Sequence, residues 1–147
     1  MKNRFMELSI YGEKTYRVFL DLIKHELDKL NVNDITAIQA FILMNISSNV
    51  VTIGEVLTRG YYIGSNASYN LKKMINNEYL TQSTADYDKR ASHLRVTDKG
   101  KELCHKLSNI LDAKTSKVAK GLDIEKGLES LKKVQNSLKD ALQLSPL

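Results

Sequence analysis

The sequence predicts an α+β protein that is mainly helical and carries one small β-hairpin. Three observations support this class. Over most of the 147 residues, apolar residues recur every three or four positions, only 1 Pro and 7 Gly interrupt them, and the period changes in one central stretch. With 42% hydrophobic residues, the chain can bury a core of ordinary size. We therefore expect a single domain, residues 1–147, in which helices surround a hairpin.

Two helices are predicted in the first third of the chain. The first runs from Tyr16 to Leu30, because its apolar residues share one face: Tyr16, Phe19, Leu20, Ile23, Leu27 and Leu30. The stretch from Asn31 to Asp34 breaks that pattern, and its polar residues can cap the second helix. The second helix carries Ile35, Ile38, Phe41, Ile42 and Ile46, and the polar run at 47–49 ends it.

Two short helices around a glycine-containing turn are predicted next, which is typical of a helix-turn-helix. Thr52 and Glu55 have the spacing of a capping box, so a short helix starts there and runs through Leu57. The turn begins at Arg59-Gly60, and Ser65 opens the following helix. The inward residues of that helix are Ala67, Leu71, Met74 and Ile75.

The period then changes to that of strands. Residues 79–84 and 92–97 are rich in β-branched and aromatic residues, and the polar segment 85–91 between them predicts an exposed, charged hairpin tip. Val50-Val51 is too short for more than a one-rung strand.

Two further helices are predicted after the hairpin. One restarts at Thr97-Asp98 and ends near Gly121, with an apolar stripe made of Leu103, Leu107, Ile110, Leu111, Val118 and Leu122. Asp123 can cap the last helix, whose stripe is close to a heptad repeat: Ile124, Leu128, Leu131, Val134, Leu138 and Leu142.

Composition and motifs exclude several classes of protein. The single Cys rules out an intrachain disulfide and a multi-cysteine zinc site, and the three His lack metal-binding spacing, so we expect no metal and no cofactor. Neither a G-x-S-x-G motif nor a P-loop occurs, so we expect no enzyme. No apolar run reaches about 18 residues, and the first residues do not resemble a signal peptide. We therefore expect a cytoplasmic protein without a membrane segment.

Motifs around the predicted hairpin carry a family resemblance. Asp88-Lys89-Arg90 in the tip and Leu94 to Gly100 after it resemble the D-x-R and L-T-x-x-G motifs of the MarR family of winged helix-turn-helix transcriptional regulators, with Val96 in the Leu place. Glu78 stands where that family usually has Gly before the first wing strand. The resemblance implies a DNA-binding part at residues 31–99, flanked by helical dimerisation parts at 1–30 and 100–147. The run from Arg59 to Gly64 also resembles a narrower branch, the LdtR-type regulators linked to cell-wall transpeptidase genes.

Polar residues on the outward face of the helix opened by Ser65 can reach base edges in a major groove. Asn can pair bidentately with adenine, lysines meet phosphates, and wing arginines contact the backbone or a narrow minor groove. The resemblance implies that Asp88 orients the wing arginine. A solvated polar surface is the alternative. The predicted DNA contacts are Ser65, Asn66, Ser68, Tyr69, Asn70, Lys72, Lys73, Lys89, Arg90 and Arg95, within a segment, 59–95, that holds six basic and three acidic residues.

The last helix needs a partner, because its stripe is too long for one short winged domain to cover. Pairing with a second chain gives a two-fold homodimer that presents two recognition helices to a pseudo-palindromic operator in double-stranded DNA. Packing of the first, fifth and sixth helices within one chain is the alternative.

The resemblance also implies a small-molecule effector site between the dimerisation helices and the winged part. Its candidates are Tyr16, Phe19, Phe41 and Met44, for which core packing is the alternative role. We expect Cys104 to be a small buried side chain rather than an oxidant sensor. The sequence thus predicts a sequence-specific DNA-binding transcriptional regulator, a dimeric repressor relieved by an effector. The alternative is a helical interaction module whose winged part binds protein.

Overall fold

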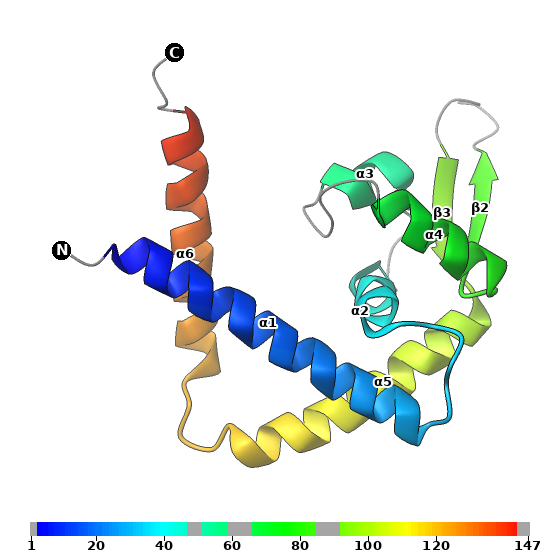
Figure 1. The fold of residues 1–147 in the computed structure, drawn as a ribbon, viewed down its shortest axis with the longest axis horizontal. Helices are drawn as coiled ribbons and strands as arrows, with labels where there is room; N and C mark the ends of the chain where they lie inside the picture. Colours follow the sequence, from blue (N-terminus) through cyan, green and yellow to red (C-terminus); the bar gives the residue numbers. More distant parts are fainter. Residues whose placement is uncertain (1–2, 47–50, 59–65, 85–91, 144–147) are drawn as a thin grey trace. The chain divides into compact units, whose positions relative to one another are not determined.

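The computed structural model describes residues 3–46, 51–58, 66–84 and 92–143, drawn in colour in Figure 1. Within these residues lie six helices and three strands in the predicted order, and the predicted winged helix-turn-helix fold is confirmed. The elements are α1 (Arg4–Lys29), α2 (Ala37–Ile46), β1 (Val51–Thr52), α3 (Ile53–Thr58), α4 (Asn66–Asn76), β2 (Leu80–Thr84), β3 (Ser92–Val96), α5 (Asp98–Val118) and α6 (Ile124–Gln143).

The chain forms two compact units, Met1–Leu111 and Asp112–Leu147. The first unit holds α1 to α4, the sheet and the greater part of α5, and the second holds the end of α5 and α6. The predicted functional division into a DNA-binding part at 31–99 and dimerisation parts at 1–30 and 100–147 stays a prediction.

The core of the first unit draws on every helix of that unit and on one side of the sheet. Its largest fully buried side chains are Ile23, Leu27, Ile42, Leu43, Ile46, Val51, Val56, Met74, Leu80, Leu94 and Leu107. Burying a side chain of this size stabilises the fold by roughly 1.5–3 kcal/mol. Because α4 and β3 both contribute to this cluster, the two elements predicted to meet DNA are anchored from behind by the same core.

The start of the first unit is a long helix that begins before its apolar stripe. Asn3 caps α1, since Asn3 Oδ1 accepts hydrogen bonds from the backbone N–H groups of Phe5 and Met6 at 3.1 and 3.2 Å. At the other end, Asn31 adopts a left-handed conformation with φ 54°, and Val32 N–H donates to Leu27 O at 2.9 Å. This Schellman turn ends the helix where the sequence pattern breaks.

The sheet is small and antiparallel, with strand order β1-β3-β2. The predicted hairpin is confirmed: β2 pairs with β3 from Leu80↔Val96 to Thr84↔Ser92. The short strand β1 adds Val51↔Leu94 and Thr52↔His93. The predicted capping box at the start of α3 is also present, because Thr52 N–H donates to Glu55 Oε2 at 2.7 Å and Glu55 N–H donates to Thr52 Oγ1 at 3.1 Å.

The second unit is helical and exposed. Helix α5 ends at Val118, so Leu122, predicted to lie on its stripe, follows the helix instead. Gly121, predicted near its end, has a φ of +87°, a conformation that suits glycine. Lys126 N–H donates to Asp123 Oδ1 at 2.9 Å, which confirms the predicted cap of α6. No side chain of α6 is buried, and Leu128, Leu131, Leu138 and Leu142 are all exposed.

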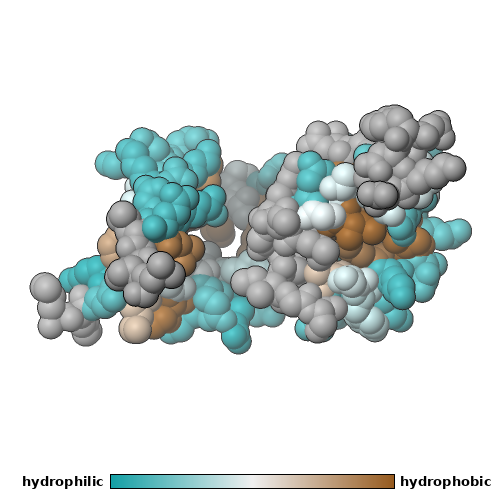
Figure 2. Space-filling view, turned by 90° about the horizontal axis from the view of Figure 1, so that it is seen from above, coloured by the Kyte–Doolittle hydropathy of each residue, from teal (hydrophilic) through white to brown (hydrophobic). Residues whose placement is uncertain are grey.

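The described surface mixes charged and apolar side chains, and the space-filling view in Figure 2 shows brown, apolar areas between the teal ones. Besides α6, the N-terminal half of α1 contributes to the exposed apolar side chains: Phe5, Met6, Leu8, Ile10 and Tyr11. No helix within the described ranges has the length and apolar character needed to cross a bilayer.

Candidate nucleic-acid interface

Helix α4 separates a buried side from a polar side. Ala67, Leu71 and Met74 are buried, as predicted, and Ile75 is half-buried against the core. The opposite side exposes five of the predicted DNA contacts and leaves a sixth, Asn70, half-buried: Asn66, Ser68, Tyr69, Asn70, Lys72 and Lys73. The structure thus brings these six residues together on one helix. Ser65 lies outside the described residues.

The side chain of Asn70 is held by a neighbouring helix. Gln39, buried in α2, donates from Nε2 to Asn70 Oδ1 at 3.0 Å. Gln39 also closes a capping box with Thr36 at the start of α2. One buried amide therefore joins the start of α2 to the polar face of α4.

The C-terminal end of α4 is closed by a Schellman turn. Tyr79 N–H donates to Met74 O at 2.9 Å, and Glu78 N–H donates to Ile75 O at 3.0 Å. Glu78 has a φ of 62°, in the left-handed region where glycine is favoured. This is the position where the sequence departs from the motif of the family it resembles, so the backbone keeps the turn although the glycine is absent.

A polar cluster ties this turn to α5 and to the segment before α2. Tyr79 OH donates to Asp34 Oδ1 at 2.6 Å, and Lys99 Nζ donates to Asp34 Oδ2 and to Asn77 O at 2.8 and 2.9 Å. Lys99 Nζ also lies 4.2 Å from the centre of the Tyr79 ring. We call Asp34, Asn77, Tyr79 and Lys99 the α4 clamp, because they hold the end of that helix.

The clamp changes the acidity of two of its members. Partial burial raises the pKa of Asp34, but the hydrogen bonds from Lys99 and Tyr79 and the charge of Lys99 outweigh it, and the net pKa falls below its usual value. Burial, together with the hydrogen bond to the Asp34 carboxylate, raises the pKa of Tyr79. Both shifts keep Asp34 charged and Tyr79 protonated, which is the state in which the cluster is hydrogen-bonded.

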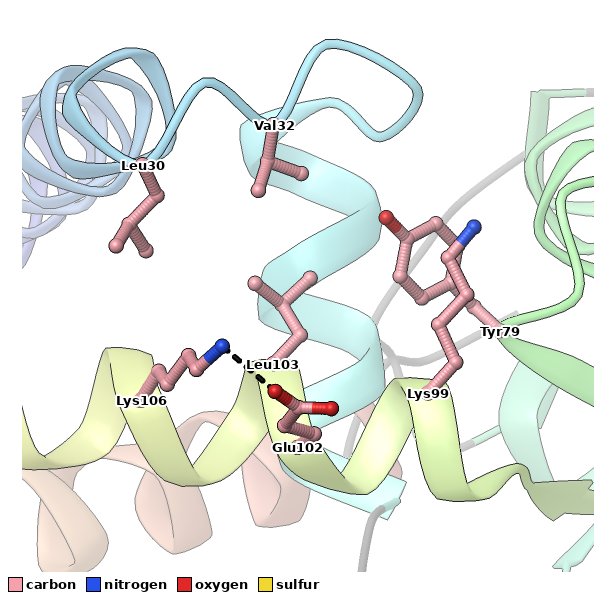
Figure 3. Close-up of a pocket in the computed structure, with 7 residues that line it drawn as sticks. All are labelled: Leu30, Val32, Tyr79, Lys99, Glu102, Leu103 and Lys106. Atoms are coloured by element: carbon pink, nitrogen blue, oxygen red, sulfur yellow. Dashed lines mark hydrogen bonds and ion pairs between the residues drawn. The ribbon is translucent and has the colours of Figure 1, made fainter.

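Figure 3 shows Lys99 beside the Tyr79 ring at one wall of a cavity of about 190 Å³. Leu30, Val32 and Leu103 supply apolar side chains to the cavity, and Lys106 pairs with Glu102 at 2.6 Å along α5. Sequence reasoning did not identify the clamp or the cavity.

Gly100, the last residue of the L-T-x-x-G resemblance, explains how closely α5 approaches this region. A Cβ at position 100 would lie 2.6 Å from Tyr79 O and 2.6 Å from Val96 Cγ1. Only glycine fits there without a shift of backbone. The Thr of the same motif, Thr97, donates from Oγ1 to Glu78 O at 2.6 Å.

In the hairpin, the structure places one of the predicted DNA contacts. Arg95 is exposed on β3 opposite Thr81, while its neighbours Leu94 and Val96 are buried. Strand β2, next to β3, packs against α4. Asp88, Lys89 and Arg90 lie outside the described residues.

Three of the four predicted effector residues form an aromatic cluster between α1 and α2. Tyr16 and Phe19 meet Phe41 edge to face, with ring centres 5.5 and 6.1 Å apart, and Met44 is half-buried against the core. The cavity beside Lys99 is lined by other residues. Cys104 is buried, and burial raises the pKa of its thiol to about 11, as expected for a structural cysteine.

Sequence reasoning missed two residues that position this face, Gln39 and Asp34. A signal for Gln39 was present, since Thr36 and Gln39 have the T-x-x-Q spacing of a capping box. Asp34 carried no such signal, because its partners Tyr79 and Lys99 lie 45 and 65 residues away in the chain.

Comparisons with known proteins find the same winged helix arrangement in DNA-binding proteins. Residues 35–100 match the family model described as a winged helix DNA-binding domain. Over 100 residues the chain is 39% identical to the exopolysaccharide II synthesis transcriptional activator ExpG of Rhizobium meliloti, a match that covers 68% of this chain. The chain spans about half of that relative, 52% of its length.

Among solved structures, the fold is similar to that of a MarR family transcriptional regulator from Listeria monocytogenes complexed with 26mer DNA. That match has a TM-score of 0.76 at 19% identity and covers 96% of this chain and 92% of the other. Streptococcus pneumoniae FabT in complex with DNA matches with a TM-score of 0.69 at 18% identity, covering 96% of this chain and 99% of the other. At 18–19% identity, these two matches show that the folds are alike and nothing further.

Proposed function

We propose that the chain, which has a winged helix fold, belongs to the MarR type and is a homodimeric, sequence-specific DNA-binding transcriptional regulator. Helix α4 is its recognition helix, and Arg95 with the hairpin tip forms its wing. The observation that carries the proposal is the polar face of α4, which stays exposed while the rear of the helix is buried in the core. A helix so anchored can enter a major groove with its first turns against base edges.

Two kinds of contact are proposed on α4. Asn66, Ser68 and Asn70 read base edges, while Lys72 and Lys73 neutralise phosphates and position the helix without reading sequence. Tyr69 is 60% exposed and contacts a thymine methyl group or a phosphate. Ser65 at the helix start, and Lys89 and Arg90 in the hairpin tip, complete the proposed contacts, with Asp88 orienting Arg90.

Dimerisation is supported by apolar side chains that the chain leaves exposed. Leu131 and Ile124 in α6 are 54% and 59% exposed, and Phe5 and Met6 in α1 are 49% and 62% exposed. Isolated helices gain most of their stability by burying such a face, so a second copy that covers it is favoured. The dimer then presents two copies of α4 to half-sites about one turn of DNA apart.

The direction of regulation is proposed as repression by occupying a promoter, relieved by a small molecule that binds at Tyr16, Phe19, Phe41 and Met44. Such a ligand acts by favouring one spacing of the two recognition helices. The relative from Rhizobium meliloti is named an activator. A promoter–reporter fusion, measured with and without the protein, decides between a fall and a rise in transcription.

The experiment that tests the proposal is selection of bound duplexes from a random pool, followed by a salt titration of the selected duplex. We expect a pseudo-palindromic site whose affinity falls steeply with salt, because phosphate contacts release counterions. Replacing Lys72 and Lys73 by Ala is expected to reduce the slope of log K against log[salt] by about 3.6 for the dimer, since each of its two chains loses two phosphate contacts and each contact contributes about 0.9. Removing the same charge from α6, by Lys132→Ala with Lys139→Ala, is the matched control and leaves the slope unchanged.

Arg90→Ala is expected to weaken binding to every sequence and to flatten the salt slope. If the variant dimer bound the operator as tightly as the parent at every salt concentration, the assignment of the hairpin tip as a DNA-contacting wing would be wrong.

The alternative function, a helical interaction module whose winged part binds protein, predicts different behaviour on the same material. Such a protein would leave a column of random duplex DNA without salt dependence, and it would retain a partner chain in a pull-down. That pair of results would replace the DNA-binding proposal.

A further inference from the structure

Gln39 is held by the backbone of α2 in one orientation. It is 4% exposed and stands at the third position of the helix. Thr36 N–H donates to Gln39 Oε1 at 3.1 Å, and Gln39 N–H donates to Thr36 Oγ1 at 3.2 Å. A backbone N–H can only donate, so its partner must be the amide oxygen of Gln39. The two ends of the Gln39 amide are therefore distinguished by the capping box.

This orientation is passed on to Asn70. The Gln39 amide nitrogen also can only donate, and it lies 3.0 Å from the Asn70 side chain. Asn70 therefore meets it with Oδ1, and Nδ2 takes the opposite side of the Asn70 amide. Among the described residues, Nδ2 has no hydrogen-bond partner.

The Asn70 amide remains accessible on the face of α4. Asn70 is half-buried, and together with Tyr69 and Lys73 it lines an open hollow of about 280 Å³ beside Thr36 and Gln39. Because Oδ1 already accepts from Gln39, Nδ2 is the atom of the Asn70 amide left to bind a group on this face. The face of α4 is thus biased toward hydrogen-bond acceptors at this residue.

We propose that Gln39 is a positioning residue that sets the base preference of Asn70, so that Asn70 reads guanine rather than adenine. The inference rests on the proposed function, since it takes α4 to lie in a major groove. It reverses the general expectation that an Asn on a recognition helix pairs with adenine.

The two purines differ at the atom that faces such an amide. Guanine presents two acceptors, N7 and O6, whereas adenine presents the acceptor N7 and the donor N6. An unrestrained Asn pairs with adenine by donating from Nδ2 and accepting at Oδ1. In this chain Oδ1 already accepts a hydrogen bond from Gln39 at 3.0 Å, and Gln39 leaves Nδ2 as the donor that can meet a base. Nδ2 can donate to N7 of either purine, but it cannot bond to the N6 donor of adenine. Both hydrogens of Nδ2 find acceptors on guanine.

The test reverses the polarity of Gln39 while keeping its shape. Gln39→Glu keeps the capping box, which accepts Glu or Gln at this position, but offers only acceptors to Asn70. Asn70 then turns Nδ2 inward and Oδ1 outward. Gln39→Leu removes both side-chain hydrogen bonds and leaves the amide free to turn. Duplexes are selected from a random pool at pH 8 by the parent, both variants and Asn70→Ala, and thermal melts of each protein confirm folding.

The measured quantity is the ratio of affinities for guanine and adenine at the operator position whose preference Asn70→Ala abolishes. We expect the parent to favour guanine about five- to tenfold, the lower part of the range for one base contact. We expect Gln39→Glu to favour adenine at that position and Gln39→Leu to bind both purines equally. Affinity for random duplex is expected to be the same for the parent, Gln39→Leu and Asn70→Ala, and lower for Gln39→Glu, which adds one negative charge per chain.

Three results would overturn the inference: a parent that favours adenine there, a Gln39→Glu variant that keeps the parent's preference, or a Gln39→Leu variant that loses affinity for all sequences equally and keeps the parent's preference. If Asn70→Ala changes no position, the inference also fails. In each of these cases the parent still selects a site with a salt-dependent affinity, so the proposed function stands. If the parent protein selects no sequence from the pool, both the role of Gln39 and the proposed DNA-binding function are wrong.

Discussion

Replacing Glu78 by Gly is expected to stabilise the protein, although it removes a whole side chain. Glu78 closes the Schellman turn after α4 with a φ of 62°, and its side chain is exposed. A residue with a Cβ is destabilised by roughly 1–2 kcal/mol when its backbone lies in the left-handed region, because the Cβ comes too close to the following carbonyl oxygen. Glycine avoids that strain, but it gives the unfolded chain more conformational entropy, which lowers the free energy of unfolding by about 0.5–1 kcal/mol. The net gain is about 1 kcal/mol.

The gain converts to a melting temperature through the entropy of unfolding. At about 2.1 cal/mol/K per residue, the first unit, Met1–Leu111, unfolds with about 0.23 kcal/mol/K. We therefore expect Glu78→Gly to raise Tm by about 4 °C, measured by calorimetry or circular dichroism.

Glu78→Ala is the matched control, because it removes the same charge and side chain but keeps the Cβ. Its Tm is expected to stay close to that of the parent. If the Gly and Ala variants melted at the same temperature, the left-handed backbone at position 78 would store no strain, and the reasoning from φ would be wrong.

Three further predictions concern the clamp and the core. Gly100→Ala is expected to lower the free energy of unfolding by about 1–3 kcal/mol in a denaturant titration, because a Cβ would lie 2.6 Å from Tyr79 O. The pKa of Asp34 is lowered in the folded state, so its contribution is present above its ordinary value of 3.8 and is lost as pH falls through the folded-state pKa. The stability advantage of the parent over Asp34→Asn should therefore shrink as pH falls through 3.8 and below, as followed by urea unfolding. The Cys104 thiol, buried with a pKa of about 11, should react with a thiol reagent at pH 8 only as fast as the protein opens.

Each of these has a result that would contradict it. An Ala at position 100 that left stability unchanged would mean that α5 can move away from the turn after α4. A constant difference between the parent and Asp34→Asn over the whole pH range would mean that the carboxylate is not stabilised by its partners. Rapid labelling of Cys104 in the native protein would reopen a redox role.

The elements themselves could be predicted because their signals are local. The spacing of Ala67, Leu71 and Met74 was enough to choose the buried side of α4, and Thr52 with Glu55 was enough to start α3. The hairpin followed from the change of period. The end of α5 was placed too late, because Val118 and Leu122 continue the helical spacing although the helix stops at the first of them.

The start of α1 shows the opposite case. Its first turns expose their apolar residues, so no stripe toward a core marks them, and the helix extends from Tyr16 back to Arg4 with Asn3 as its cap. A capping residue is a short signal that periodicity alone does not weigh.

By itself, the sequence determined the order of helices and strands, the polar face of α4 and the resemblance to winged helix regulators, because these depend on residues within a few turns of one another. The tertiary structure decided how that face is held. The contacts of Asp34 with Tyr79 and Lys99, and of Gln39 with Asn70, join residues 31 to 65 positions apart, and no local pattern encodes which of them meet. Their hydrogen bonds form only when the core has brought α2, α4 and α5 together, and it is those bonds that orient the side chains on which the proposed recognition of DNA depends.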